Sequence, residues 1–115
     1  MKKFFIYNVL FSSVADGSST TTTLTLGSDA DFQLAEIRTT GTSKVRVQIK
    51  ETSGNQFSNQ PFDAAVVSSG NNGFKVVEEV ILPKQTQLDV TITNNSGGTV
   101  AASAFEVDLI GYKLQ

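Results

Sequence analysis

Apolar and polar residues alternate along most of this chain, with the period of two that is typical of a β-strand with one buried face. The clearest example is 44–51, where Val45, Val47 and Ile49 alternate with polar side chains. No window of useful length has apolar residues at the i, i+3, i+4, i+7 spacing of a helix. The pattern predicts strands over these ranges: 3–11, 20–26, 32–40, 44–51, 74–82, 87–93 and 102–114.

These short strands, separated by turns rich in Gly, Asn and Ser, predict an all-β fold. We expect residues 1–115 to form a single β-sandwich domain of seven or eight antiparallel strands, of Greek-key or jelly-roll type. Residues 1–28 are expected to supply the first two strands or an arm that reaches a neighbour. The alternation predicts one core shared by two sheets, with these members: Val45, Val47, Ile49, Leu88, Val90, Ile92, Val107 and Leu109.

Three segments depart from the regular alternation. The apolar phase slips between Leu34 and Ile37, which predicts a β-bulge. Residues 52–73 are a long polar stretch, and a loop of that length in a small domain is usually functional or shields a sheet edge. The apolar residues expected to hold this loop against the core are Phe57, Phe62, Val66 and Val67. Residues 94–98, Asn-Asn-Ser-Gly-Gly, predict a hairpin turn.

Composition narrows the possible chemistry. The chain has no cysteine and no histidine, so it lacks disulfides, the usual nucleophile–base pairs and the commonest neutral metal ligand. Charged residues make up only 17% and the formal net charge is −2. This low, slightly negative charge argues against non-specific nucleic-acid binding, because phosphate binding needs a clustered basic surface. We expect no catalytic residue, no cofactor-binding residue, no metal ligand and no cofactor.

The N-terminal segment has a superficial likeness to a signal peptide cleaved after Ala15, because an apolar run follows Lys2 and Lys3. Asn8 interrupts that run, and the residues around it suit a strand better than a signal peptide. We therefore expect this segment to belong to the fold. No run approaches the roughly 20 apolar residues of a membrane span, so we expect none.

Two pairs of carboxylates are the best candidates for chemistry. Glu78 and Glu79 are adjacent in a predicted strand, so their side chains should point to opposite faces and cannot act together on one bond. Asp29 and Asp31 follow a glycine and could approach a calcium ion. A full calcium site needs several more oxygens, and no EF-hand or nonapeptide spacing supplies them. We interpret the first pair as solvated carboxylates and the second as turn residues.

Sugar binding and glycosylation also have plainer interpretations. A lectin would need exposed flat aromatics, yet the chain has no Trp and only Tyr7 and Tyr112 besides eight Phe, most of which the core requires. Asn94, Asn95 and Ser96 fit a glycosylation sequon, but Asn-Ser-Gly segments are common in turns, and we interpret them as a turn.

A row of cations points outward from 44–51, namely Lys44, Arg46 and Lys50. Three cations are too few for a nucleic-acid site. Glu106 and Asp108 lie at period two in the last strand. We therefore expect charge pairing across strands between the two rows, or with a neighbouring subunit.

Four stretches, in order along the chain, carry a resemblance to known proteins. They are Asp-Ala-Asp-Phe-Gln-Leu at 29–34, Val-Arg-Val-Gln-Ile-Lys-Glu-Thr at 45–52 with Ser-Asn-Gln-Pro at 58–61, the segment 82–91 from Leu-Pro to Asp-Val-Thr, and Leu-Ile-Gly-Tyr-Lys-Leu at 109–114. They resemble small virion-associated β-sandwich proteins encoded among the structural genes of bacteriophages. The resemblance covers about Asp29 to the C-terminus. It implies a non-enzymatic, capsid-associated role as a decoration, vertex or minor capsid protein in the virion, made in the host cytoplasm.

The expected partners are other capsid proteins and further copies of the chain. Phe4, Phe5, Ile6 and Phe11 put apolar side chains on both faces of the first strand, more than a one-sided position in a sheet would bury. This predicts a homo-oligomer in which the chain ends or residues 52–73 make contacts, and the resemblance favours a trimer, or a pentamer at a vertex. Two alternatives stay open: a receptor- or glycan-binding module of a phage or cell surface that uses 52–73, and an exported adhesin-like domain that begins at Asp16.

Overall fold

Alternating segments of the chain become the strands of two antiparallel sheets in the computed structural model, which describes residues 2–40, 44–58, 60–67 and 74–115. The strands are β1 (Lys2–Leu10), β2 (Ser19–Thr25), β3 (Asp31–Thr39), β4 (Val45–Glu51), β5 (Phe62–Asp63), β6 (Phe74–Leu82), β7 (Gln87–Asn94) and β8 (Glu106–Leu114). The described residues contain no α-helix and one short 3-10 helix at Ala64–Val67. The predicted all-β class is therefore confirmed.

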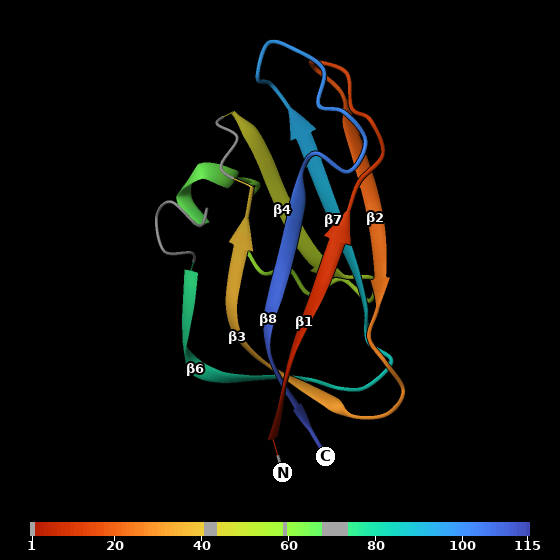
Figure 1. The fold of residues 1–115 in the computed structure, drawn as a ribbon, viewed down its shortest axis with the longest axis vertical. Coiled ribbons are helices and arrows are strands. Elements are labelled where there is room, and N and C mark those ends of the chain that lie inside the picture. The colour runs from red at the N-terminus through yellow and green to blue at the C-terminus, as the bar shows by residue number, and fades with distance from the viewer. Residues whose placement is uncertain (1, 41–43, 59, 68–73) are drawn as a thin grey trace.

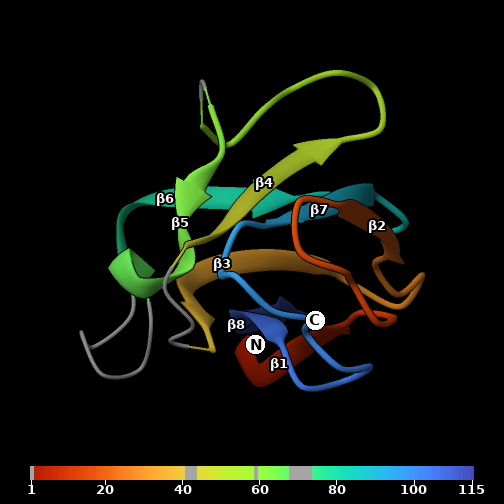
Figure 2. The same cartoon turned by 90° about the horizontal axis from the view of Figure 1, so that it is seen from above.

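The two sheets each contain four strands, in the orders β1-β8-β3-β6 for the first sheet and β2-β7-β4-β5 for the second sheet. Figure 1 shows β1 and β8 in front of β4 and β7, and Figure 2 shows the same two layers from above. Successive strands mostly alternate between the sheets, so most connections cross from one layer to the other. This arrangement is compatible with the predicted sandwich.

Inward-facing side chains of both sheets meet in one hydrophobic core. All eight residues predicted for this core are fully buried, which confirms the assignment of faces by alternation. Two larger side chains, Phe32 and Phe105, are also fully buried, and Phe105 lies just before β8. The alternation of burial is clearest in β4 and β7, whose outward residues are half-buried or exposed.

The predicted β-bulge is confirmed. The register of β3 shifts between Leu34 and Glu36. Against β8, Ala35 is the one residue left out of the pairing, whereas against β6 the partners change from Val80 to Lys75. The extra residue brings Ile37 to the core side, where it lies opposite Leu109. It also brings Glu36 to the outward face of the first sheet, opposite Ile110.

The segment 52–73 has more structure than the sequence indicated. Gln56 forms an isolated bridge with Lys50, and β5 pairs with β4 before the 3-10 helix. Phe57 and Phe62 pack partly buried against the core, as predicted. The side chains of Val66 and Val67, and residues 59 and 68–73, lie outside what the structure describes.

Two sequence predictions near the C-terminus were wrong. Residues 94–98 do not form a hairpin, because β7 belongs to the second sheet and β8 to the first, so the connection crosses between layers. The last strand begins at Glu106 rather than at 102. The connection instead forms a bridge between Val14 and Val100 and then turns at 101–104 into the buried Phe105.

Residues near both ends of the chain belong to the first sheet. β1 pairs with β8 along its whole length, from Lys2 opposite Leu114 to Leu10 opposite Glu106, and the two ends lie side by side in Figure 1. β2 pairs with β7 in the second sheet. Of the two alternatives for residues 1–28, the described part adopts the first two strands.

Candidate functional site

The outward side chains of β1 and β8 form a continuous surface on the first sheet, which we call the β1–β8 face. Because directly opposite residues of an antiparallel pair point to the same side, the register gives its five rows. They are Lys2–Leu114, Phe4–Tyr112, Ile6–Ile110, Asn8–Asp108 and Leu10–Glu106. The intervening residues of both strands, such as Val9 and Leu109, point into the core.

The β1–β8 face is unusually apolar for a surface turned to solvent. Phe4 is 60% exposed, Ile6 and Leu10 are each 44% exposed, and Tyr112 is 37% exposed. The rings of Phe4 and Tyr112 pack edge to face, with centroids 6.2 Å apart. Ile81 on β6, at 42% exposed, extends this surface on the far side of β3.

One end of the face is basic and the other is acidic. The Lys2 ammonium lies 5.8 Å from the centroid of the Tyr112 ring. At the opposite end the amide of Asn8 donates hydrogen bonds of 2.5 Å to both Glu106 Oε2 and Asp108 Oδ1. The pKa of Glu106 is raised, chiefly by its hydrogen bond with Asp108 and then by burial and the Asp108 charge, against the opposing effect of Asn8. The two carboxylates therefore repel one another when both are ionised.

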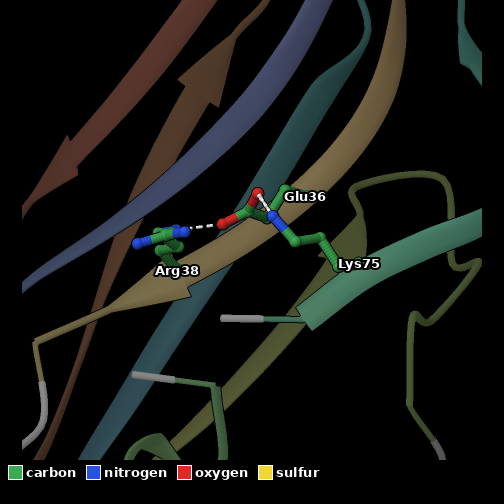
Figure 3. Close-up of polar contacts among 3 residues, drawn as sticks. All are labelled: Glu36, Arg38 and Lys75. Atoms are coloured by element: carbon green, nitrogen blue, oxygen red, sulfur yellow. Dashed lines mark hydrogen bonds and ion pairs between the residues drawn. The ribbon is translucent and has the colours of Figure 1, made fainter. Parts of the chain in front are cut away.

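An ion-pair cluster borders the face on β3 and β6 (Figure 3). Glu36 is buried although it points outward, because Arg38 and Lys75 cover it. Arg38 Nε bonds one carboxylate oxygen, and Lys75 Nζ lies 2.6 Å from the other. Burial acts to raise the pKa of Glu36, but the hydrogen bonds and charges of Lys75 and Arg38 outweigh it and hold the pKa below its ordinary value. The cluster fixes β6 to β3.

The outward face of the second sheet has a different chemistry. Cross-strand hydrogen bonds of 2.8 Å join Ser19 to Thr93 and Thr21 to Thr91, and Thr23 donates a bond of the same length to Asp89. Polar side chains of this kind satisfy one another and suit contact with water. The two outer surfaces of the molecule are therefore unlike: one is hydroxyl-rich, and the other carries exposed apolar side chains bordered by charged ones.

The predicted basic row lies on this hydroxyl-rich side. Lys44 precedes β4, while Arg46 and Lys50 point outward from it. Arg46 Nη2 donates a 2.7 Å hydrogen bond to the Pro61 carbonyl, and Lys50 lies opposite Asp89. The expected pairing of this row with Glu106 and Asp108 within the chain is wrong, because β4 and β8 belong to different sheets.

The two aspartates considered for calcium have separate partners. Asp29 Oδ2 accepts bonds from Lys113 Nζ at 3.0 Å and from Gln115 Nε2 at 3.4 Å. Asp31 Oδ1 instead accepts a 2.9 Å bond from the backbone N–H of Lys84. The Lys113 hydrogen bond is the main reason why the pKa of Asp29 is lowered. Each carboxylate thus ties a chain segment in place.

Asn94 of the sequon is fully buried. Its Nδ2 donates to the carbonyls of Val14 and Gly98, and its Oδ1 accepts from both the backbone N–H and the hydroxyl of Ser96. Every hydrogen-bonding position of the amide is used. The nitrogen that a glycan would occupy is therefore committed to joining the N-terminal segment to the turn after β7.

The remaining sequence candidates are the pair Glu78 and Glu79 and the two tyrosines. Glu79 is exposed on β6, and the side chain of Glu78 lies outside what the structure describes. Tyr7 is buried and accepts a 2.9 Å bond from the Gly27 N–H, so it cannot serve a ligand as Tyr112 could. No group of three or more Asp and Glu side chains that could hold a metal occurs in the described ranges.

The β1–β8 face and the Glu36 cluster were not predicted as sites. The sequence shows the apolar residues of β1, but alternation does not specify that β1 pairs with β8, and so it does not place their partners. Once the bulge is known, Glu36 and Arg38 fall on one face, so the sequence did carry part of that signal. Lys75 comes from a distant strand and could not have been placed.

Within the residues that the structure places, no helix has the length and apolar character that crossing a membrane requires. Nor does any buried side-chain nitrogen or oxygen in that part lack a hydrogen-bond partner, so no orphaned polar group indicates a missing ligand. No protein-family model matches the chain, and no curated protein matches it.

Proposed function

We propose that this chain is a non-catalytic structural protein of a bacteriophage virion, bound to the capsid as a decoration, vertex or minor capsid protein. It acts through contacts between protein subunits. The observation that carries the proposal is the exposed apolar surface of the β1–β8 face. The setting in a virion comes from the sequence resemblance described above.

A contiguous apolar patch on a small protein favours an interaction surface. Single exposed apolar residues are ordinary, but neighbouring ones that share a sheet face mark interfaces. Phe4, Ile6, Ile110 and Tyr112 are such neighbours by register. The hydroxyl-rich outer face of the second sheet supports the same interpretation, because it provides the surface suited to remain in water.

We further propose that the two sheets form a β-sandwich of jelly-roll type. The strand orders β1-β8-β3-β6 and β2-β7-β4-β5 support this, because strands from the two halves of the chain pair in succession, β1 with β8, β2 with β7 and β3 with β6. Jelly rolls serve in viral capsids and also in lectins. The fold type is therefore consistent with the proposed role without selecting it.

The absence of catalysis is part of the proposal. Its support is the lack of histidine and cysteine, together with the separate partners of Asp29 and Asp31. Elemental analysis of protein purified without chelators is expected to show no stoichiometric transition metal. Stoichiometric zinc, manganese or iron, or a hydrolytic activity that tracks the protein through purification, would contradict this part.

Virion association is tested with purified particles. The chain should remain with gradient-purified capsids in a fixed copy number, and electron microscopy should show its density on the outer shell at symmetric positions. From the resemblance, we expect the copies at those positions to form a trimer, or a pentamer at a vertex. If the chain is absent from purified particles, the proposed function is wrong.

A receptor- or glycan-binding module is the second candidate, and the exposed aromatic pair Phe4 and Tyr112 favours it. Aromatic rings exposed at a surface are what a sugar would contact. These rings meet at 72°, however, so they do not form a flat platform. A sugar-induced rise in melting temperature that is lost in Tyr112→Ala would support this candidate over the structural role.

A further inference from the structure

We infer that the β1–β8 face binds the same face of a second copy of this chain, with the strands of the two copies antiparallel. The two-fold axis would cross the strands at the middle row, Ile6–Ile110. This inference rests on the proposed function, because it names the partner of the surface on which that proposal depends.

The pairing register of β1 with β8 determines which rows would face each other in this dimer. Ile6–Ile110 is the third of the five rows, with two rows on either side. A two-fold axis through the middle row lays the first row of one copy over the fifth row of the other, and the second over the fourth. Ile6 and Ile110 then face their own counterparts, so the apolar centre of the face covers itself.

The charges on the face select the antiparallel arrangement. On β1 and β8, Lys2 lies at one end, and Glu106 and Asp108 lie near the other. Arg38 of β3 lies opposite Asp108, but its Nε is bonded to Glu36. Antiparallel stacking brings Lys2 of each copy to the acidic end of the other copy, and it places the Tyr112 hydroxyl opposite Asp108. Parallel stacking would gather both acidic ends together, and like charges at close range oppose binding.

The exposed side chains also favour stacking of faces over pairing of edges. β1 is an edge strand of the first sheet, so two copies could in principle extend the sheet through it. Such edge pairing would leave the outward side chains of Phe4, Ile6 and Leu10 in water. Stacking of the faces covers them.

The size of the surface sets the expected strength. Eight residue steps at about 3.4 Å and two strands at about 4.8 Å give a planar area on the order of 250 Å² per copy. Standard interfaces bury roughly 800 Å² per partner, so the contact should be a weak and reversible one. We therefore expect the free protein to be monomeric at low concentration and to form dimers only as its concentration is raised.

Sedimentation velocity over a concentration series is the first test. Ile6→Lys places like charges face to face at the axis and should weaken dimerisation at least about ten-fold. The matched control is Thr25→Lys, which adds the same charge at an exposed position of β2 on the opposite outer face and should change nothing. Equal melting temperatures of both variants establish that both fold.

Charge exchange is the second test, and it reports the antiparallel register directly. Lys2→Glu alone and Glu106→Lys alone each place like charges in both symmetry-related contacts of a homodimer, so each variant should dimerise more weakly than the unmodified chain. A mixture of the two variants restores opposite charges in both contacts and should form heterodimers. If the mixture associates no better than the separate variants, the antiparallel register is wrong.

Cross-linking separates face stacking from edge pairing. The chain has no cysteine, so Ile110→Cys introduces a unique thiol at the axis. Stacked sheets lie about 10 Å apart, too far for a disulfide but within reach of a short bis-maleimide. We expect a cross-linked dimer from Ile110→Cys and none from Thr25→Cys. If the two copies instead paired edge to edge through β1, their two β8 strands would lie on opposite sides of the β1–β1 junction. Ile110→Cys should then not cross-link.

The outcomes distinguish the inference from the proposed function. A dimer that Ile6→Lys dissociates supports the inference. A trimer or a pentamer, the states that the resemblance favours, overturns the inference and leaves the proposed function standing. A monomer at all concentrations also overturns the inference. If the chain is monomeric yet binds particles, the inference is wrong and the proposed function stands. If it is monomeric and does not bind particles, both are wrong.

Discussion

Gly111 on β8 lies against the backbone of Gln33 on β3 so closely that a Cβ atom at position 111 would overlap the Gln33 carbonyl oxygen. The same Cβ would lie 2.9 Å from the Phe32 ring, which is fully buried. Neither neighbour can give way without moving the strand or the core. The close packing of β3 on β8 at this point therefore requires glycine.

Gly111→Ala should lower the free energy of unfolding by about 2 kcal/mol or more, through the strain of overpacking. The measurement is urea unfolding followed by circular dichroism. Gly98→Ala is the matched control, because a Cβ there meets nothing within 4 Å. A Gly111→Ala variant as stable as the control would contradict the packing described.

The buried side-chain amide of Asn94 joins the segment around Val14 to the turn at Gly98, and both lie outside the sheets. Asn94→Ala should cost on the order of 2–4 kcal/mol, because it leaves the Val14 and Gly98 carbonyls without this donor. Asn95→Ala, at the exposed neighbouring position, should stay within about 0.5 kcal/mol of the unmodified chain. Equal losses from the two substitutions, again by urea unfolding, would show that the network does not stabilise the fold.

Ile92 on β7 lies at the centre of the shared core and is fully buried. Ile92→Ala should reduce the free energy of unfolding by about 2–5 kcal/mol, since it removes buried methyl groups and leaves a cavity. Thermal and urea unfolding should agree on this loss. A loss below about 0.5 kcal/mol would mean that the residue is not in the core.

Glu36 should make stability fall in acid. Its pKa is held below the ordinary value of 4.5, so its charge stabilises the fold above about pH 4.5 and this contribution is lost as pH falls through the folded pKa. Glu36→Gln should therefore reduce stability at neutral pH and flatten the decline below about pH 4.5. Urea unfolding over a pH series measures both effects. A variant with an unchanged acid decline would contradict the role of the cluster.

Glu106 should change stability with pH in the opposite direction to Glu36. Its pKa is raised, so its stabilising contribution is complete below the ordinary value of 4.5 and is lost as pH rises through the folded pKa. Glu106→Gln should make the chain more stable at neutral pH, with the gain vanishing in acid. Both chains are compared at a protein concentration at which sedimentation shows them to be monomers. A gain that persists unchanged at low pH would not come from the Asp108 interaction.

Much of the fold was predictable because alternation reports which face each residue occupies. The core residues of β4 and β7 follow from it, and the phase slip after Leu34 gave the bulge. Alternation does not report which strands are neighbours. The wrong hairpin at 94–98 and the wrong pairing of the row Lys44, Arg46 and Lys50 with the acidic residues of β8 share this cause, since both required knowledge of sheet membership.

The site was less predictable than the fold because it depends on residues far apart in sequence. Phe4 and Tyr112 become neighbours only through pairing of the first and last strands. Asn94 looked like a turn residue with a sequon, and its burial follows from the approach of Val14 across the end of the molecule. Each case depends on long-range pairing that a local pattern does not contain.

The pairing of Lys2 with Leu114 makes this chain suitable for circular permutation. A short linker from Leu114 to Lys2 would turn β1 and β8 into an ordinary hairpin, and new ends could open at the exposed Gly54 turn between β4 and β5. The longest-range strand pair in sequence would then become the most local one. Folding of such a permutant should be faster if closure of β1 on β8 limits the rate.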